Sequence, residues 1–109
     1  MNVNNASIFA GIPQQLAEEL CQTLVSKPSI RIERIVSKGH SSPAGFWYDQ
    51  DQDEWVLLLK GQARLEIFNR PPINLREGDY LLIPAHCKHR VAWTDPAQET
   101  VWLAVHFPG

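Results

Sequence analysis

The chain has 109 residues, a length that suits one domain built around one hydrophobic core. Its hydrophobic content of 44% and net charge of -2 are ordinary for a globular domain and lack the positive charge that attracts nucleic acid or anionic membranes. No stretch approaches the roughly 18 apolar residues of a membrane span, and the first residues do not form a basic segment followed by an apolar one. We therefore expect neither membrane insertion nor export, and predict a cytoplasmic protein.

The first predicted element is an amphipathic helix over residues 13–26. Pro13 suits the first turn of a helix, three leucines recur at intervals of four residues, and Pro28 ends the pattern. Residues 1–29 are thus expected to form an extension with one helix, which serves as a lid on the domain or as a contact with a second copy. The apolar residues of this extension predict a homodimer, because a small domain does not bury them alone.

From Ile30 onward the hydrophobic period changes to two residues, which is typical of half-buried strands. Turn-forming clusters rich in Pro, Gly, Asn and Asp, namely NRPP, REGD and TDPAQ, separate the later strand-like runs. This pattern predicts an all-β sandwich or barrel over residues 30–109. The expected strands lie at residues 30–33, 55–59, 64–67, 80–83, 89–93 and 101–107.

Two spaced motifs lie on these predicted strands. Glu54 is followed after six residues by Gly61, and the run GDYLLIPAHCKH places Gly78, Pro84 and His89 at fixed spacings. Over roughly residues 30–107 the chain resembles the cupin superfamily, whose motifs are H-x-H-x(3,4)-E-x(6)-G and G-x(5)-P-x-G-x(2)-H-x(3)-N. The resemblance implies a small single-domain cupin, which is an all-β jelly roll (a double-stranded β-helix barrel), here with a short N-terminal helix.

The chain departs from the cupin pattern at the positions of the metal ligands. Tyr48 and Gln50 stand where the first motif has its two histidines, whereas Glu54 and His89 keep the family's ligand types. The resemblance implies a divalent ion such as zinc, nickel, iron or manganese, with Tyr48 and Gln50 as weaker ligands because a phenol and an amide replace imidazoles. The alternative is a metal-free pocket in which the four side chains hydrogen-bond one another or water.

Other residues are candidates for lining the pocket. Trp93 takes the place of the last asparagine of the second motif, and strand alternation predicts that it faces inward, as a wall for a small ligand or as core. Phe46 and Gln52 complete the predicted ligand-binding set, since alternation directs Gln52 inward and Phe46 adds aromatic surface. His86 replaces a glycine and is either a further metal ligand or a solvated loop residue.

The remaining cysteines and histidines are not expected to act as ligands. Cys21 and Cys87 are expected to be free thiols, and Cys87 suits a small buried hydrophobe better than a ligand. His106 alternates with apolar neighbours on the last predicted strand, so we expect it on the face away from the pocket. His40 is expected in a loop near the pocket entrance.

Three functions remain open at this point. The cupin resemblance implies a metal-dependent dioxygenase or isomerase acting on a small organic molecule, with Tyr48 as a catalytic acid or orienting donor. A module that binds a small molecule or a metal without turnover is the second, and a scaffold with a relic pocket is the third. The missing histidines favour the binding module, because redox iron chemistry depends on imidazole ligands.

Overall fold

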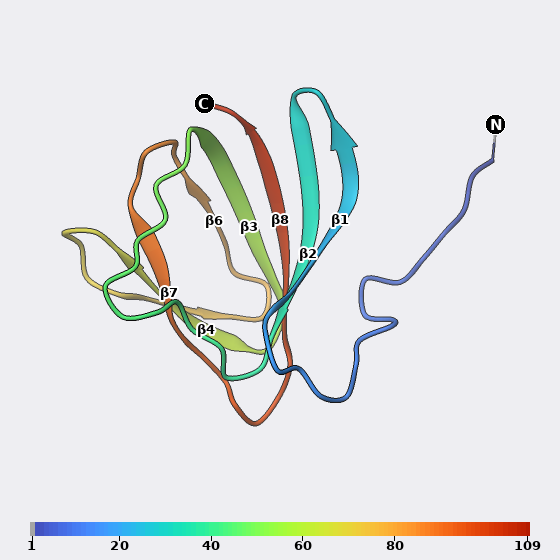
Figure 1. Ribbon diagram of the computed structural model, residues 1–109, viewed down its shortest axis with the longest axis horizontal. Helices are drawn as coiled ribbons and strands as arrows, with labels where there is room; N and C mark the ends of the chain where they lie inside the picture. The colour runs from blue at the N-terminus through green and yellow to red at the C-terminus, as the bar shows by residue number, and fades with distance from the viewer. Residues whose placement is uncertain (1) are drawn as a thin grey trace.

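The computed structural model describes residues 2–109 and consists of two antiparallel sheets that face one another (Figure 1). One sheet has the strand order β1-β2-β8-β3-β6 and the other β5-β4-β7. The expected all-β double-sheet architecture is confirmed, but the sheets do not close into a barrel. The strands are β1 (Leu20–Lys27), β2 (Ile30–Ser37), β3 (Gln52–Lys60), β4 (Gln62–Ile67), β5 (Ile73–Arg76), β6 (Tyr80–Ile83), β7 (His89–Thr94) and β8 (Thr100–Pro108).

The helix predicted over residues 13–26 is wrong. The chain forms β1 there instead, which pairs with β2 across a tight connection at residues 28–29. This hairpin satisfies backbone groups along the edge of β2, which a helix would leave open. A β-bulge between Thr23 and Val25 interrupts the period of two, and nearly every β1 side chain is exposed, so the strand carries no alternating signal. Within residues 2–109 no helix is long and apolar enough to cross a membrane.

The hydrophobic core fills the space between the two sheets. Its centre is formed by inward-facing residues of β3, β4 and β8, and Leu58 is completely buried. Burying an aliphatic side chain of this size stabilises the fold by about 1.5–3 kcal/mol relative to leaving it exposed. The core therefore fixes which faces of β3 and β8 point inward.

Gly61 has a structural role that explains its fixed distance from Glu54. It ends β3 with a φ of +93°, and a Cβ atom at this position would lie 2.7 Å from the carbonyl oxygen of Glu99. Only glycine combines this backbone conformation with so close an approach. The turn thus sets the register of β3, and Glu54 falls on its inner face.

Candidate functional site

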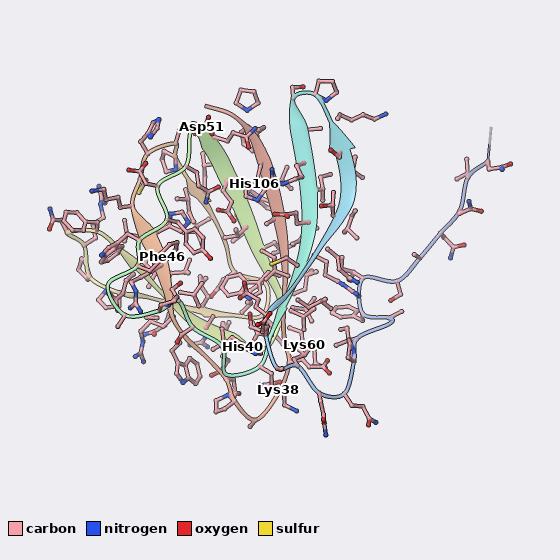
Figure 2. The ribbon with its side chains drawn as sticks, viewed as in Figure 1. Lys38, His40, Phe46, Asp51, Lys60 and His106 are labelled. Atoms are coloured by element: carbon pink, nitrogen blue, oxygen red, sulfur yellow. The ribbon has the colours of Figure 1, made fainter. Side chains whose placement is uncertain are left out.

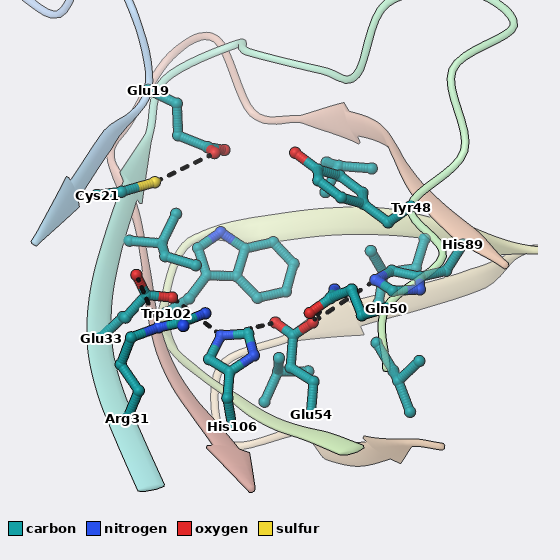
Figure 3. A pocket seen from close by; sticks show the side chains of 15 residues that line it. Glu19, Cys21, Arg31, Glu33, Tyr48, Gln50, Glu54, His89, Trp102 and His106 are labelled. Atoms are coloured by element: carbon teal, nitrogen blue, oxygen red, sulfur yellow. Dashed lines mark hydrogen bonds and ion pairs between the residues drawn. The ribbon is translucent and has the colours of Figure 1, made fainter. Parts of the chain in front are cut away.

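A cavity of about 230 Å³ lies between the two sheets (Figure 3). Its walls are mostly apolar and include the indole of Trp102 from β8. A cluster of charged and polar side chains from five strands, the segment before β1 and the loop before β3 interrupts them. The apolar lining consists of Ile35, Val56, Leu65, Ile83, Val91 and Trp102, and the polar lining of Glu19, Cys21, Arg31, Glu33, Tyr48, Gln50, Glu54, His89 and His106.

Glu54 is the centre of the polar cluster and is buried on the inner face of β3. Gln50 Nε2 donates a hydrogen bond to its Oε1 over 3.0 Å, and His89 Nε2 lies 3.6 Å from the same oxygen. His106 Nε2 lies 4.0 Å from Oε2. Burial raises the pKa of Glu54, but the contact with His89, the charge of His106 and the bond from Gln50 outweigh it and hold this pKa below its usual range. Glu54 is therefore a buried carboxylate in its charged form.

His89 faces Glu54 from β7 in a fixed orientation. Its Nδ1 donates to the carbonyl oxygen of Cys87 over 2.9 Å, which leaves Nε2 directed at the Glu54 carboxylate. Burial lowers the pKa of His89, but Glu54 and the Cys87 carbonyl raise it above its ordinary value. Tyr48 lies beside it because the two residues exchange backbone hydrogen bonds of 2.7 and 3.1 Å, and their rings stack at 5.5 Å.

His106 is a member of the cluster that the sequence did not reveal. The expectation that it faces away from the pocket is wrong, because β8 pairs with β3 so that His106 lies opposite Glu54, between the sheets (Figure 2). The residues that alternate with it in sequence point outward instead. Its Nε2 lies 2.9 Å from Glu33 Oε1, and its buried Nδ1 has no hydrogen-bond partner among residues 2–109. The sequence did carry one signal for this position. Both faces of the last strand carry apolar residues, so alternation alone does not exclude His106 from the inner face.

Two carboxylates besides Glu54, those of Glu19 and Glu33, also line the cavity. Glu19 accepts a hydrogen bond of 2.7 Å from Ser37 Oγ and forms no ion pair within residues 2–109. Burial, followed by the charges of Glu19 and Glu33, raises the pKa of the Cys21 thiol to about 11. Burial and Glu19 likewise raise the pKa of Tyr48. Both groups stay protonated at neutral pH, so Cys21 is a poor nucleophile and Tyr48 a hydrogen-bond donor.

Trp93 does not line the cavity, contrary to expectation. In the pairing of β4 with β7, Leu65 lies opposite Val91 but Arg64 lies opposite Trp93, so Ala92 is an extra residue in β7. Such a bulge moves every later side chain to the other face. Trp93 consequently points outward and is 38% exposed.

Three further predicted residues also lie outside the cavity lining. Phe46 is exposed on the loop before β3 and touches the Tyr48 ring edge-on, with centroids 4.9 Å apart (Figure 2). Gln52 lies at the first position of β3, beyond the cavity. The His86 side chain is 70% exposed and its Nδ1 lies 3.0 Å from Asp49 Oδ1. Its φ of +61° explains why cupins place glycine at this turn.

The donor atoms in the cavity fit a metal ion only in part. Glu54 Oε1 and His89 Nε2 are 3.6 Å apart, and two ligands that each lie about 2.1 Å from one cation have a separation of this order. However, residues 2–109 contain no group of three or more His, Cys, Asp or Glu side chains placed to hold a metal. Gln50 and Tyr48 are the only other predicted ligands that line the cavity, and their donors are weak.

Two facing sheets with a carboxylate and an imidazole meeting between them define a cupin-type domain. Residues 33–106 match the family model for the cupin domain, and the chain therefore belongs to the cupin family. Among the curated proteins, none matches the chain.

Solved structures extend this likeness. A crystal structure from Ralstonia eutropha JMP134, which carries the name "putative mannose-6-phosphate isomerase", is 46% identical, with a TM-score of 0.95 over 98% of this chain and 100% of that chain. A cupin superfamily protein from Desulfitobacterium hafniense DCB-2 is 20% identical, with a TM-score of 0.74 over 90% of this chain and 84% of that chain. An RmlC-like cupin from Methanocaldococcus jannaschii is 19% identical, with a TM-score of 0.70 over 90% and 87%. The last two share the fold alone.

Proposed function

We propose that this chain binds a small, uncharged organic molecule in the cavity between its sheets. The observation that carries the proposal is the buried cluster of Glu54, His89 and His106 in a cavity whose walls are mostly apolar. Ligand sites typically combine an apolar lining with a few polar groups that orient the ligand. A volume of about 230 Å³ is below the roughly 300 Å³ at which drug-sized sites begin, so the ligand is compact.

The charges around the cavity favour an uncharged ligand over a phosphorylated one. Three carboxylates, Glu19, Glu33 and Glu54, line the cavity together with a single guanidinium, that of Arg31. Arg31 Nε already lies 3.6 Å from Glu33 Oε2. A phosphate group carries a charge of about -1.5 to -2 and is usually bound by several cationic or N–H donors. The other possible cations of the cavity, the imidazoles of His89 and His106, already face Glu54 and Glu33, and the carboxylate of Glu19 repels an anion.

Mannose and mannose 6-phosphate are a matched pair of probes for this proposal, since the name of the Ralstonia eutropha protein refers to the second. We expect mannose to raise the melting temperature more than its phosphate does. A ligand at a hundredfold excess over its Kd stabilises the native state by about 2.7 kcal/mol. Differential scanning fluorimetry measures both shifts.

Three isosteric variants control this measurement. Glu54→Gln removes the buried charge and should reduce the mannose shift, whereas Asp51→Asn removes an exposed charge outside the cavity and should not. Glu19→Gln removes a carboxylate that repels the phosphate. It should therefore reduce the difference between the melting-temperature shifts produced by mannose and by mannose 6-phosphate. A larger rise in melting temperature with mannose 6-phosphate than with mannose would contradict the preference for an uncharged ligand. No rise with either sugar would rule out a ligand of hexose size.

A metal-dependent enzyme, such as an isomerase or a dioxygenase, is the second candidate function. It is supported by the 46% identity to a protein named as an isomerase and by the spacing of Glu54 and His89. Zinc, nickel, iron or manganese bound by this pair would act as a Lewis acid. Tyr48, whose raised pKa keeps the phenol protonated, would donate a hydrogen bond to the substrate. Catalytic turnover by this chain and its location in the cytoplasm both stay predictions.

Metal binding by Glu54 and His89 should be visible in thermal stability. We expect divalent zinc or nickel to raise the melting temperature of the parent protein, because the native state holds both donors 3.6 Å apart and the unfolded chain does not. His89→Ala should abolish the shift. His86→Asn, which removes an exposed histidine and suits the positive φ, should preserve it. Equal losses in both variants would place the metal elsewhere.

A further inference from the structure

A second cavity of about 240 Å³ adjoins the one between the sheets. It is lined by residues 17–19 before β1, by residues 40–43 of the loop after β2, and by Tyr48 and Val91. Glu19, Tyr48 and Val91 line both cavities. The carboxylate of Glu19 and the hydroxyl of Tyr48 point toward one another at one end of the first cavity (Figure 3). The two cavities, here called the inner and the outer cavity, therefore meet at these side chains.

Hydrogen bonds to β7 hold the loop wall of the outer cavity in place. The backbone N–H of Ser42 donates to the carbonyl oxygen of Val91 over 2.9 Å, and Ser42 Oγ accepts from the backbone N–H of Val91 over 3.0 Å. Thr94 Oγ1 donates to the carbonyl oxygen of His40 over 2.6 Å. A wall that is already fixed in this way loses little conformational freedom when a ligand binds, so the entropic cost of binding is small.

His40 connects this loop to the opposite wall of the outer cavity. Its Nδ1 accepts a hydrogen bond from the backbone N–H of Lys38 over 2.8 Å, so Nε2 carries the ring proton and donates to the carbonyl oxygen of Leu16 over 3.1 Å. Both ring nitrogens are thus occupied. His40 therefore positions the segment that contains residues 17–19 and offers no donor of its own to a ligand.

The polar groups that remain in the outer cavity suit a neutral ligand with hydroxyl groups. Among the described residues, its lining contains the carboxylates of Glu18 and Glu19 and the hydroxyl of Ser41, but no lysine or arginine. Neither carboxylate forms an ion pair within residues 2–109. Carboxylate oxygens accept hydrogen bonds from hydroxyl groups, and a serine hydroxyl both donates and accepts. An anionic group is repelled here, as it is in the inner cavity.

We propose that the two cavities form one extended site and that its ligand is an uncharged disaccharide, with one sugar ring in each cavity. This assignment rests on the proposed function, the binding of a compact uncharged molecule in the inner cavity. Each cavity alone is smaller than the roughly 300 Å³ at which ordinary ligand sites begin, whereas the two together lie within their range. The oxygen that links the two rings lies between Glu19 and Tyr48, where the Tyr48 hydroxyl donates to it.

Titration calorimetry tests the proposal by comparing the dissociation constants of mannose and of mannobiose, in which two mannose units are joined by a glycosidic bond. We expect the parent protein to bind mannobiose about tenfold more tightly, the effect of one or two added hydrogen bonds. Ala17→Phe places an aromatic ring in the outer cavity and should lower the affinity for mannobiose to that for mannose. Ala97→Phe is the matched control, because Ala97 is exposed and lines neither cavity.

Glu18→Gln is a second variant, which keeps the shape of the outer cavity and removes one carboxylate. It should weaken mannobiose binding by about threefold or more. Asp51→Asn, at an exposed residue outside both cavities, should not weaken it. Circular dichroism shows whether each variant keeps the strand signal, and Glu18→Gln carries the test if Ala17→Phe does not fold.

Equal affinities of the parent protein for mannose and mannobiose would overturn the proposal and leave the inner-cavity ligand intact, as would a gain that survives both outer-cavity variants. Mannosamine carries an amine that is protonated at neutral pH. Tighter binding of mannosamine than of mannobiose would mean that the carboxylates select a cation and would also overturn the proposal. Absence of binding by both mannose and mannobiose would reject the extended site together with the proposed function.

Discussion

The double variant Tyr48→His with Gln50→His should bind zinc, nickel or ferrous iron at least about a hundredfold more tightly than the parent, or roughly 2.7 kcal/mol. Both residues line the cavity with Glu54 and His89. The Gln50 amide already lies 3.0 Å from Glu54 Oε1, and Tyr48 is bound through its backbone to His89. Two added imidazoles would complete a set of four strong donors.

Titration calorimetry on chelator-treated protein measures this gain. Asp51→His is the matched control, because it adds one imidazole close in sequence to the two positions but at an exposed residue outside the cavity lining. We expect the control to change affinity little. If the double variant folds and yet binds these metals no more tightly than the parent, Tyr48 and Gln50 do not face the metal position.

The second large effect concerns stability. Glu54→Gln should lower the free energy of unfolding by about 3 kcal/mol near pH 5.5, because removing one partner of a buried ion pair leaves the other uncompensated. The side chains of Glu54 and His89 are only 11% and 7% exposed, so solvent screens their interaction little.

The loss should depend on pH in a defined window. The pKa of Glu54 is lowered from 4.5, so its contribution is complete above about pH 4.5 and disappears as the pH falls through the lowered value. The pKa of His89 is raised from 6.5, so its contribution is complete below about pH 6.5 and disappears as the pH rises through the raised value. The difference between parent and variant should therefore be largest between pH 4.5 and 6.5.

Urea unfolding from pH 4 to pH 9 measures that difference. Asp51→Asn again serves as the control, since this exposed carboxylate has no ion pair in the described chain and its removal should shift the curves little. A Glu54→Gln penalty that is the same at every pH would mean that the pair is held by packing and not by charge.

The sequence by itself determined the family and the central pair of the site. The spacing from Glu54 to Gly61 and from Gly78 to His89 is set by local requirements, because both glycines hold a positive φ at strand ends. These turns lie at the end of β3 and just before β6, so nearby residues alone set where β3 ends and β6 begins. Glu54 and His89 could thus be placed together, with Tyr48 and Gln50 beside them, before any contact was known.

Only the tertiary structure decided which other residues join the pair. A period of two shows which side chains share a face, but the identity of the inner face depends on the strands that pair with the segment and on bulges that arise in this pairing. His106 faces inward because β8 pairs with β3, and Trp93 faces outward because Ala92 is bulged. Residues 20–27 form a strand because β2 offers them an open edge. In each case a hydrogen-bonded neighbouring strand outweighed the local pattern, since the backbone groups of a strand are satisfied only by pairing with another segment of the chain.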